Sequence, residues 1–544
     1  MIKTLLTAFL LISTFSVFSD NGKDQLWQWN TTVKLTDNAG KNYTVSPYLW
    51  IPPVCSQIHA VIIASTAVIE QLIVENPSIR SLCSNYGIAI VWSDTQFYHD
   101  EQTGLKQIQD ILEHFAKLSG YDELKTVPWI PIGHSATLKM IRDMAKLKTD
   151  KLAFMIMNKN NNGFGFSPSV PTLITYGEFV EWDSYNVDLK ANVLKDKAYP
   201  NLIKARESNL LVSYYFDPNT GHFDCSKSLM SCIVSWMAAI CKLRFNARGE
   251  LNAVSPEQGW VCQPPVPGFK GFMPKKFVDA TNQERMNAWF PSFETALAAF
   301  NRANVSMTRK PQLAGFADKD GNYEEGWWRA IMYNIPYIQN ADGTLTIHAI
   351  PYFKMPQGNY ANKYTDDKSS PDYGKLYSFI NKSDVFSNSG NPLNVEVMSG
   401  NVRKIDNHSY EYIPRFQSPS YLIVREEGDS IYRTSVQPGR LIFKEIATGS
   451  QNVITFPPIP NQHLKHLSPV QLKATSSSGL KLKYFVQYGA AHIDRQQRLI
   501  VEAENIPPRT KFPYSVSVVA YQLGSETPAV KTARSVSCTF SISK

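Results

Sequence analysis

The sequence predicts an α/β protein whose first half is a parallel sheet covered by helices on both faces, followed by two β-rich parts. Three observations predict this fold class. Short apolar strands alternate with amphipathic helices between residues 50 and 245, and near-continuous apolar strands are typical of parallel sheets buried on both faces. A segment rich in proline and glycine follows at 247–272. Short strands and turns dominate the rest of the chain.

The first 19 residues predict a secretory signal peptide, removed before folding. Lys3 precedes one apolar run from Leu5 to Phe18, and the cleavage site is expected at Val17-Phe18-Ser19. The alternative is an N-terminal membrane anchor, but the run is short for a span and no stop-transfer cluster follows it. We therefore expect a secreted, periplasmic or cell-surface protein.

The domain at 20–247 is predicted from its alternating pattern. One or two strands are expected at 20–50, and further strands at 59–65, 87–93, 127–133, 151–158, 171–177 and 209–216. Helices are expected at 67–83, 103–118, 135–147 and 226–243. The connection at 159–170 is too short for a helical cap, so we expect an open site unless the middle of the chain covers it.

Two further domains are expected, because about 525 residues are too many for one core. Residues 248–454 predict a linker, one helix from Glu284 to Asn301, and a mostly-β middle domain. Residues 455–544 predict a β-sandwich, since about seven short alternating strands follow one another.

Composition excludes several classes of protein. The net charge of +8 is mild for this length and no long Lys/Arg block occurs, so no nucleic-acid partner is expected. Seven cysteines are too few for a disulfide scaffold; Cys241 with Cys262 is one conceivable pair, and buried free thiols are the alternative. The calcium-like run at 318–322 has no glutamate at the twelfth loop position, so neither a metal nor another cofactor is predicted.

Residues 131–137, Pro-Ile-Gly-His-Ser-Ala-Thr, end an apolar strand and open a helix. This is the setting of a nucleophile elbow, in which a sharp turn lifts the hydroxyl of Ser135 clear of the sheet and directs the helix N-terminus at the reacting centre. Gly133 and Ala136 are small, as such a turn requires. Thr137 stands where the usual motif has its second glycine, which weakens the motif and leaves an ordinary helix-capping turn as the alternative.

A serine hydroxyl needs a base, and such sheets supply a histidine after their last strand. His222 follows the strand at 209–216 and precedes the closing helix, so we expect it to be that base. A lone histidine is more often structural, but its position favours the catalytic role.

The acid that orients the histidine is expected after the preceding strand, at 171–177. Glu181 and Glu178 are both candidates, with Glu181 favoured because it lies deeper in the loop, and Asp183 is a distant third. Spacing alone does not choose between them.

Two N–H donors are expected to bind the oxyanion. One is the backbone of Ala136. The other is assigned by position alone to the loop after the strand at 59–65, with Ser65, Thr66 and Ala67 as candidates.

Residues 50–245 resemble the α/β-hydrolase family through Gly133-His134-Ser135-Ala136, Gly177-Glu178 and Gly221-His222-Phe223. The resemblance is to compact members in secreted bacterial proteins that process glycans. The segments "ATSSSGLKLKYFV" and "NIPPRTKFPYSVSVVAYQ" resemble immunoglobulin-like modules attached to such proteins.

These features predict a secreted serine hydrolase of carboxylic esters that removes acyl groups from a polysaccharide or another bulky substrate. Its partners are an ester or glycan-linked substrate, with no transmembrane anchor beyond the signal peptide. The alternative is a catalytically impaired α/β-hydrolase scaffold in a glycan-binding or adhesin-like protein, which Thr137 and the ambiguous acid favour and the serine–histidine pairing disfavours.

Overall fold

A computed structural model describes residues 27–37, 39–97, 101–147, 149–159, 170–177, 185–186, 191–192, 199–265, 271–322, 333–352, 375–377, 380–381 and 387–544. The predicted signal peptide lies outside these ranges.

The first half of the chain is built on an eight-stranded sheet in the order β1-β4-β6-β5-β7-β8-β9-β12. Its strands are β1 (Trp29–Asn30), β4 (Pro47–Trp50), β5 (Ala60–Ser65), β6 (Ile88–Ser93), β7 (Trp129–His134), β8 (Met155–Asn158), β9 (Thr172–Gly177) and β12 (Val212–Asp217). The strands from β6 to β12 are parallel, and β4 and β1 extend one edge antiparallel. Outside it, β2 (Val33–Thr36) pairs with β3 (Asn42–Val45), and β10 (Tyr185–Asn186) pairs with β11 (Ala191–Asn192). This confirms the predicted α/β-hydrolase sheet.

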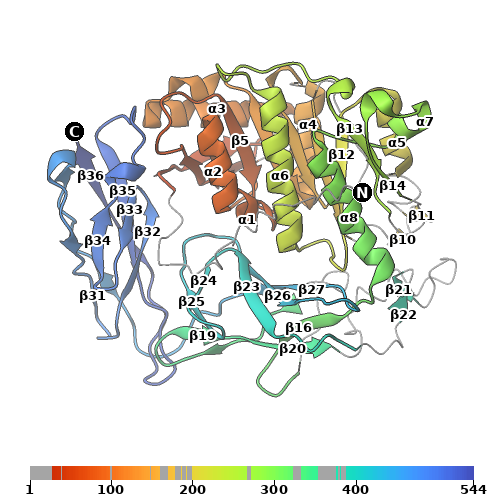
Figure 1. Ribbon diagram of the computed structural model, residues 1–544. Helices are drawn as coiled ribbons and strands as arrows, with labels where there is room; N and C mark the ends of the chain where they lie inside the picture. Colours follow the sequence, from red (N-terminus) through yellow and green to blue (C-terminus); the bar gives the residue numbers. More distant parts are fainter. Residues whose placement is uncertain are drawn as a thin grey trace, which may run out of the picture.

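Helices cover both faces of this sheet. On one face α2 (Pro77–Tyr86) contacts α6 (Lys227–Arg244), and on the other α3 (Glu101–Ser119) contacts α4 (Leu138–Leu147), as right-handed crossovers require (Figure 1). The short helix α1 (Glu70–Val74) follows β5, and α5 (Tyr199–Glu207) precedes β12. The helices predicted at 103–118, 135–147 and 226–243 are found within a few residues.

The helix predicted at 67–83 is divided in two. The side chain of Asn76 accepts hydrogen bonds from the N–H groups of Ser78 (2.9 Å) and Ile79 (3.3 Å), which caps a new helix whose first residue is Pro77. Proline suits the first helical position because it has no N–H to satisfy there. The break leaves α1 as a separate turn beside the end of β5.

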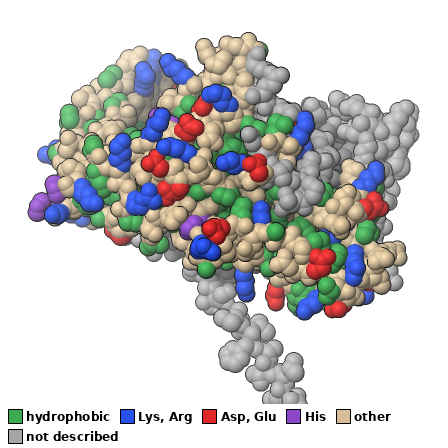
Figure 2. All heavy atoms as spheres, turned by 90° about the horizontal axis from the view of Figure 1, so that it is seen from above, with side chains coloured by type: hydrophobic (Ala, Val, Ile, Leu, Met, Phe, Trp, Pro, Cys, Tyr) green, Lys and Arg blue, Asp and Glu red, His purple; other side chains and the backbone are tan. Residues whose placement is uncertain are grey.

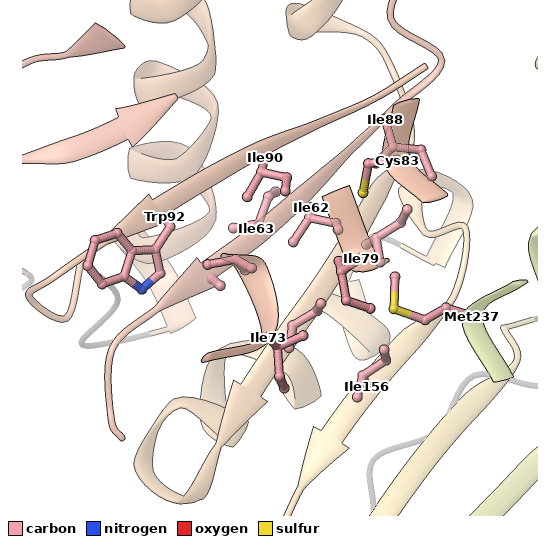
Figure 3. Packing of buried hydrophobic residues seen from close by; sticks show 14 of the residues in the cluster. Ile62, Ile63, Ile73, Ile79, Cys83, Ile88, Ile90, Trp92, Ile156 and Met237 are labelled. Carbon is pink, nitrogen blue, oxygen red and sulfur yellow. The ribbon is translucent and has the colours of Figure 1, made fainter. Parts of the chain in front are cut away.

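The core beneath α2 and α6 is apolar throughout (Figure 3). Ile62 of β5 is paired with Ile90 of β6, and neither is exposed. Ile79 of α2 and Met237 of α6 cover these strands, also without exposure. Each such side chain contributes roughly 1.5–3 kcal/mol by leaving water, so the sheet is the rigid base on which the loops at its ends are held.

The packing of the first half of the chain continues past residue 247, where the sequence predicts a boundary. A three-stranded antiparallel sheet and a helix follow, comprising β13 (Trp260–Gln263), β14 (Phe272–Lys276), α7 (Asn282–Arg285), β15 (Ala288–Phe290) and α8 (Phe293–Thr308). Their side chains join the same core, and Arg206 Nε donates to Asn287 O at 3.1 Å. The helix predicted from Glu284 begins at Phe293 instead, because the residues before it pair as a buried strand with β13 and Ser292 caps the helix. Residues up to the end of α8 therefore pack with the large sheet, beyond the boundary predicted at 247.

The middle region is mostly β, as predicted. It contains β16 (Leu313–Ala317), β17 (Tyr333–Asn334), β18 (Ile338–Gln339), β19 (Thr344–Thr346), β20 (His348–Tyr352), β21 (Lys375–Tyr377), β22 (Ile380–Asn381), β23 (Leu393–Ser399), β24 (Val402–Lys404), β25 (Ser409–Tyr412), β26 (Ser420–Glu426) and β27 (Ser435–Leu441). The main pairings form two four-stranded sheets, β17-β27-β26-β23 and β18-β19-β25-β24.

The middle region lies against the carboxyl ends of the parallel strands (Figure 1). Ser399 Oγ donates to Val68 O just after β5 (3.1 Å), and Gln417 N donates to Asp94 Oδ2 just after β6 (2.8 Å). Asn219, after β12, donates to Thr434 O at 3.0 Å. Loops at this edge carry the functional groups of α/β sheets, so the middle region adjoins the candidate site.

The C-terminal region holds three small sheets, β29-β36-β35-β32, β30-β34-β33 and β28-β31, and confirms the predicted β-rich end. Its strands are β28 (Ile454–Thr455), β29 (Gln462–His463), β30 (Val470–Gln471), β31 (Thr475–Ser476), β32 (Lys483–Tyr488), β33 (Ala491–Ile493), β34 (Arg498–Val501), β35 (Tyr514–Tyr521) and β36 (Val536–Ser543). It is joined to the hydrolase domain by Gly489 N, which donates to Trp27 O (2.8 Å), and by Lys511 N, which donates to Ser119 O (2.9 Å).

Basic and acidic side chains are interspersed on the face seen in Figure 2 rather than gathered by sign. No helix in the described part of the chain is long and apolar enough to cross a membrane. All seven cysteines are free, so the conceivable pair of Cys241 with Cys262 is not formed.

Substitution of Tyr514 tests whether hydrogen bonds between the C-terminal region and the first half of the chain contribute to stability. Its buried hydroxyl donates to Gln28 O (3.1 Å) and accepts from Ala490 N (2.8 Å). We expect Tyr514→Phe to lower the free energy of unfolding by about 1–3 kcal/mol, because both partners stay buried and unpaired. Urea unfolding followed by far-UV circular dichroism and tryptophan fluorescence should show one transition at lower urea. Tyr484→Phe, within the C-terminal region, is the control; two separate transitions would show that the regions unfold independently.

Candidate active site

The turn after β7 places Ser135 in a strained backbone conformation. Its φ is +53°, in the left-handed region that non-glycine residues adopt at a cost of about 1–3 kcal/mol. A Cβ on Gly133 would lie 2.8 Å from Thr137 Oγ1, so only glycine fits there. Ser135 is partly exposed and Ala136 is exposed. The turn thus presents the serine at the end of the sheet, as a nucleophile elbow does.

Ser135 and His222 meet at this edge. Ser135 Oγ lies 2.7 Å from His222 Nε2, within hydrogen-bond distance. The imidazole is only 2% exposed and its ring lies edge-on against Phe223, with 4.6 Å between the ring centroids. A buried imidazole in this orientation has the geometry needed to take the serine proton.

The candidate acids Glu178, Glu181 and Asp183 lie outside the described residues. Gly177, the last residue of β9, lies against the backbone before the histidine, since a Cβ on it would be 2.3 Å from Gly221 O. The choice between Glu178 and Glu181 remains a prediction.

In the loop after β5, two of the backbone N–H groups predicted to bind the oxyanion already form other hydrogen bonds. The N–H of Thr66 donates to Ser93 O at 2.9 Å, so it is already engaged in extending the sheet. The N–H of Ala67 donates to Glu70 Oε2 at 2.8 Å and is engaged as well. Ser65 is buried at the end of β5, and the exposed Ala136 opens helix α4 through the turn η2 (Ser135–Thr137). Ala136 and Ser65 stay as predicted donors, whereas the backbone N–H groups of Thr66 and Ala67 do not.

Glu70 is a site residue that the sequence did not indicate. Its carboxylate is fully buried and accepts hydrogen bonds at both oxygens: Oε2 from the N–H groups of Ala67 (2.8 Å) and Val68 (3.1 Å), and Oε1 from His134 N (2.8 Å) and Thr137 Oγ1 (2.6 Å). Burial raises the pKa of Glu70, and the hydrogen bonds from Thr137, Ala67 and Val68 act in the opposite direction. The only sequence signal is a charged residue among the apolar ones at 67–73.

Thr137 has a role that the glycine of the usual motif cannot have. Its hydroxyl lies 2.6 Å from Glu70 Oε1, 2.9 Å from His134 O and 2.8 Å from His134 N. The side chain that departs from the usual motif therefore links the turn to the buried carboxylate.

His134 contacts the backbone of His222, the candidate base. Its Nε2 lies 2.8 Å from His222 O, and the two rings are 4.9 Å apart. Burial, with a smaller contribution from the charge of His222, holds the pKa of His134 well below its usual value of 6.5. A neutral ring beside a carbonyl must carry its proton on Nε2 and donate, so His134 fixes the position of His222.

A buried charge network holds the other side of the histidine loop. Lys159 Nζ lies 3.3 Å from Asp217 Oδ2 and 3.4 Å from Asp224 Oδ1, and none of the three side chains is exposed. Arg302 of α8 forms an ion pair with Asp217, so two positive and two negative charges balance. Asp224 Oδ2 also accepts from Gly221 N at 3.0 Å, directly before His222. Sequence spacing did not reveal this network, because Lys159 and Arg302 lie far along the chain from the loop.

No group of three His, Cys, Asp or Glu side chains suited to a metal occurs among the residues that the structure describes. The calcium-like run forms a polar turn instead: Asp318 Oδ1 accepts from the N–H groups of Asp320 (2.9 Å) and Asn322 (2.8 Å).

The burial of His134 predicts a pH dependence of stability. The pKa of His134 is depressed in the folded chain, so as the pH falls below 6.5 this imidazole takes up a proton only in the unfolded chain. The free energy of unfolding therefore decreases as the pH falls below that value. Between pH 6.5 and 5.5 we expect wild type to lose about 1 kcal/mol more unfolding free energy than His134→Gln. Urea denaturation at both pH values measures this. His408→Gln, at an exposed turn, is the control; equal losses in wild type and His134→Gln would contradict the prediction.

Comparisons with known proteins give similarity in fold. No protein-family model matches the chain, and no curated protein matches it. Among solved structures, it is similar to a poly(3-hydroxybutyrate) depolymerase from Bordetella parapertussis (10% identity, 42% of this chain and 93% of that chain, TM-score 0.27). A lidless serine hydrolase from Xanthomonas campestris is similar at 14% identity, covering 39% of this chain and 94% of its own, with a TM-score of 0.26. An esterase from Mycobacterium marinum is similar at 14% identity, covering 39% and 82%, with a TM-score of 0.27.

Proposed function

We propose that this chain is a serine hydrolase that cleaves carboxylic esters. The observation that supports this most directly is the 2.7 Å approach of Ser135 Oγ to His222 Nε2 at a turn where Ser135 has a φ of +53°. Backbone strain of this kind persists where surrounding contacts hold it, and it clusters at active sites. Here the contacts come from Gly133, Thr137 and Glu70.

In the proposed mechanism Ser135 Oγ attacks the ester carbonyl carbon while His222 Nε2 takes the hydroxyl proton. The carbonyl oxygen becomes an oxyanion that the N–H of Ala136 stabilises. The carbon–oxygen bond to the alcohol then breaks, and the imidazolium returns its proton to the leaving oxygen. Water, deprotonated by the same imidazole, hydrolyses the acyl-enzyme to a carboxylate and free Ser135. One of Glu178 and Glu181 is proposed to hold the imidazole tautomer.

The proposed substrate is a short acyl group on a bulky partner such as a polysaccharide. Ser135 is partly exposed and Ala136 exposed, so the hydroxyl is reachable from outside. The middle region, through Ser399 and Gln417, adjoins the loops after β5 and β6 and offers a surface beside the site. Export by the predicted signal peptide at 1–19 fits an extracellular polymer and belongs to the same proposal.

The alternative is an impaired scaffold in a glycan-binding or adhesin-like protein, which Thr137 and the choice between two acids favour in the sequence. The hydroxyl of Thr137 is engaged within the turn, which removes the first of these reasons. A mechanism-based probe separates the two functions.

Ser135→Ala is expected to abolish turnover of p-nitrophenyl acetate, by at least about 10⁴-fold, because the nucleophile is removed. Labelling by a fluorophosphonate probe should disappear with it, while far-UV circular dichroism stays unchanged. Ser84→Ala, on helix α2, is the control and should label as wild type does. Undiminished labelling of Ser135→Ala would exclude the serine mechanism, and a wild-type chain that neither labels nor hydrolyses esters would favour the scaffold.

Chain-length preference tests the substrate proposal. Binding a long acyl chain requires a deep apolar tunnel, whereas an acetyl group needs none. We expect kcat/KM to fall from p-nitrophenyl acetate to the octanoate and palmitate esters, measured below the aggregation limit of each. A rise with chain length would show that an apolar cleft serves the site and would point to a lipid-like substrate.

A further inference from the structure

The two elements that must cooperate at the oxyanion are joined through one side chain. Glu70 Oε2 accepts from the N–H groups of Ala67 and Val68, in the loop after β5. Its other oxygen, Oε1, accepts from His134 N and from the hydroxyl of Thr137, on either side of the nucleophile. The carboxylate is 0% exposed, so no water competes for these bonds.

The distance between these elements matters for catalysis. Oxyanion donors act only when they lie about 2.7–3.1 Å from the position that the oxygen takes in the transition state. The elbow provides one predicted donor at Ala136, and Ser65, the last residue of β5 and directly before this loop, is the remaining predicted source of the second. A carboxylate has a fixed O–C–O geometry, so bonding one oxygen to each element sets their separation.

The outer side of the same loop is held as well. Ser399 Oγ donates to Val68 O at 3.1 Å, and Gly400 N donates to Gln71 Oε1 at 2.9 Å. Both donors belong to the end of β23 in the middle region. The loop after β5 therefore lies between Glu70 on its inner side and β23 on its outer side.

We propose that Glu70 is a positioning residue that fixes the loop after β5 relative to the nucleophile elbow, with Thr137 as its partner on the elbow. This inference rests on the proposed function, and it assigns Glu70 no contact with substrate. It requires that loss of the carboxylate lowers transition-state stabilisation more than substrate binding.

Glu75 provides a matched comparison, because it caps the end of the same helix α1. It is also buried, and burial also raises its pKa, although the nearby charge of Arg80 acts in the opposite direction. Its carboxylate accepts two side-chain hydrogen bonds, from Trp27 Nε1 (2.7 Å) and Gln71 Nε2 (2.9 Å), where Glu70 accepts one from a side chain and three from the backbone. Its partners belong to the hydrolase domain but not to the elbow. A loss of activity that follows from altering any buried carboxylate should appear in the variants of both residues. A loss that follows from positioning the elbow should appear only in the variant of Glu70.

The experiment compares Glu70→Gln and Glu75→Gln in the full chain. Glutamine keeps the shape but replaces one acceptor oxygen with a donor. We expect Glu70→Gln to lower kcat for p-nitrophenyl acetate about 10- to 100-fold, with KM within about threefold, since removing an oxyanion donor outright costs about 10²–10³-fold. The affinity for phenylboronic acid, whose adduct with serine mimics the tetrahedral state, should fall in parallel. Glu75→Gln should keep the wild-type kcat and boronate affinity, whatever its melting temperature.

A second pair of variants serves if Glu70→Gln does not fold. Thr137→Val removes the hydroxyl at nearly constant volume and should reproduce part of the loss in kcat and boronate affinity, and Thr137→Ser should recover it. Equal effects of Glu70→Gln and Glu75→Gln, or a normal kcat in Thr137→Val, would overturn the proposal. If wild type reacts with the fluorophosphonate probe and Glu70→Gln reacts equally fast, only the role of Glu70 fails. If wild type does not react, the proposed function fails and the role of Glu70 with it.

Discussion

The positive φ of Ser135 is the constraint around which the site is built. A side chain in this conformation is unfavourable by itself, and the structure holds it with neighbours that leave no alternative. Gly133 removes the Cβ that would clash inside the turn, and Thr137 bonds back across it. Glu70 accepts from both sides of the turn, and His134 extends from it to the carbonyl of His222, the proposed base. The strained residue and the base are therefore positioned by one set of contacts.

Patterns formed by neighbouring residues predict the strands and helices of the first half of the chain correctly. Apolar runs such as the one in β5 and stripes such as the one in α3 depend only on neighbouring residues, so they predicted the sheet, the helices and the strand–turn–helix setting of Ser135. The elements that were misplaced depend on packing instead. The strand β15 lies in a segment for which the sequence predicts helix. Its extended conformation depends on pairing with β13, and a segment of three residues is too short to show a strand periodicity.

The supports of the site could not be predicted, because their partners are distant in the chain. Glu70 and Thr137 are 67 residues apart, and Lys159 is 58 residues from Asp217. Each resembles an ordinary polar residue until the fold brings it to its partner. Arg302 was hidden further by the predicted boundary at 247, which assigned it to another domain, although it completes the charge balance around the histidine loop. Sequence motifs therefore indicate Ser135 and His222, but not the residues that position them.

The ion pair of Arg302 with Asp217 also limits how the protein can be divided. A fragment that ends at residue 247 keeps every strand of the large sheet together with both reacting side chains. It leaves Asp217 beside Lys159 with one cation for two buried carboxylates, an imbalance that proteins relieve by taking up a proton or admitting water. Either response loosens the loop that carries His222. A fragment that keeps the loop around His222 firmly held must therefore include α8 as well as the eight-stranded sheet.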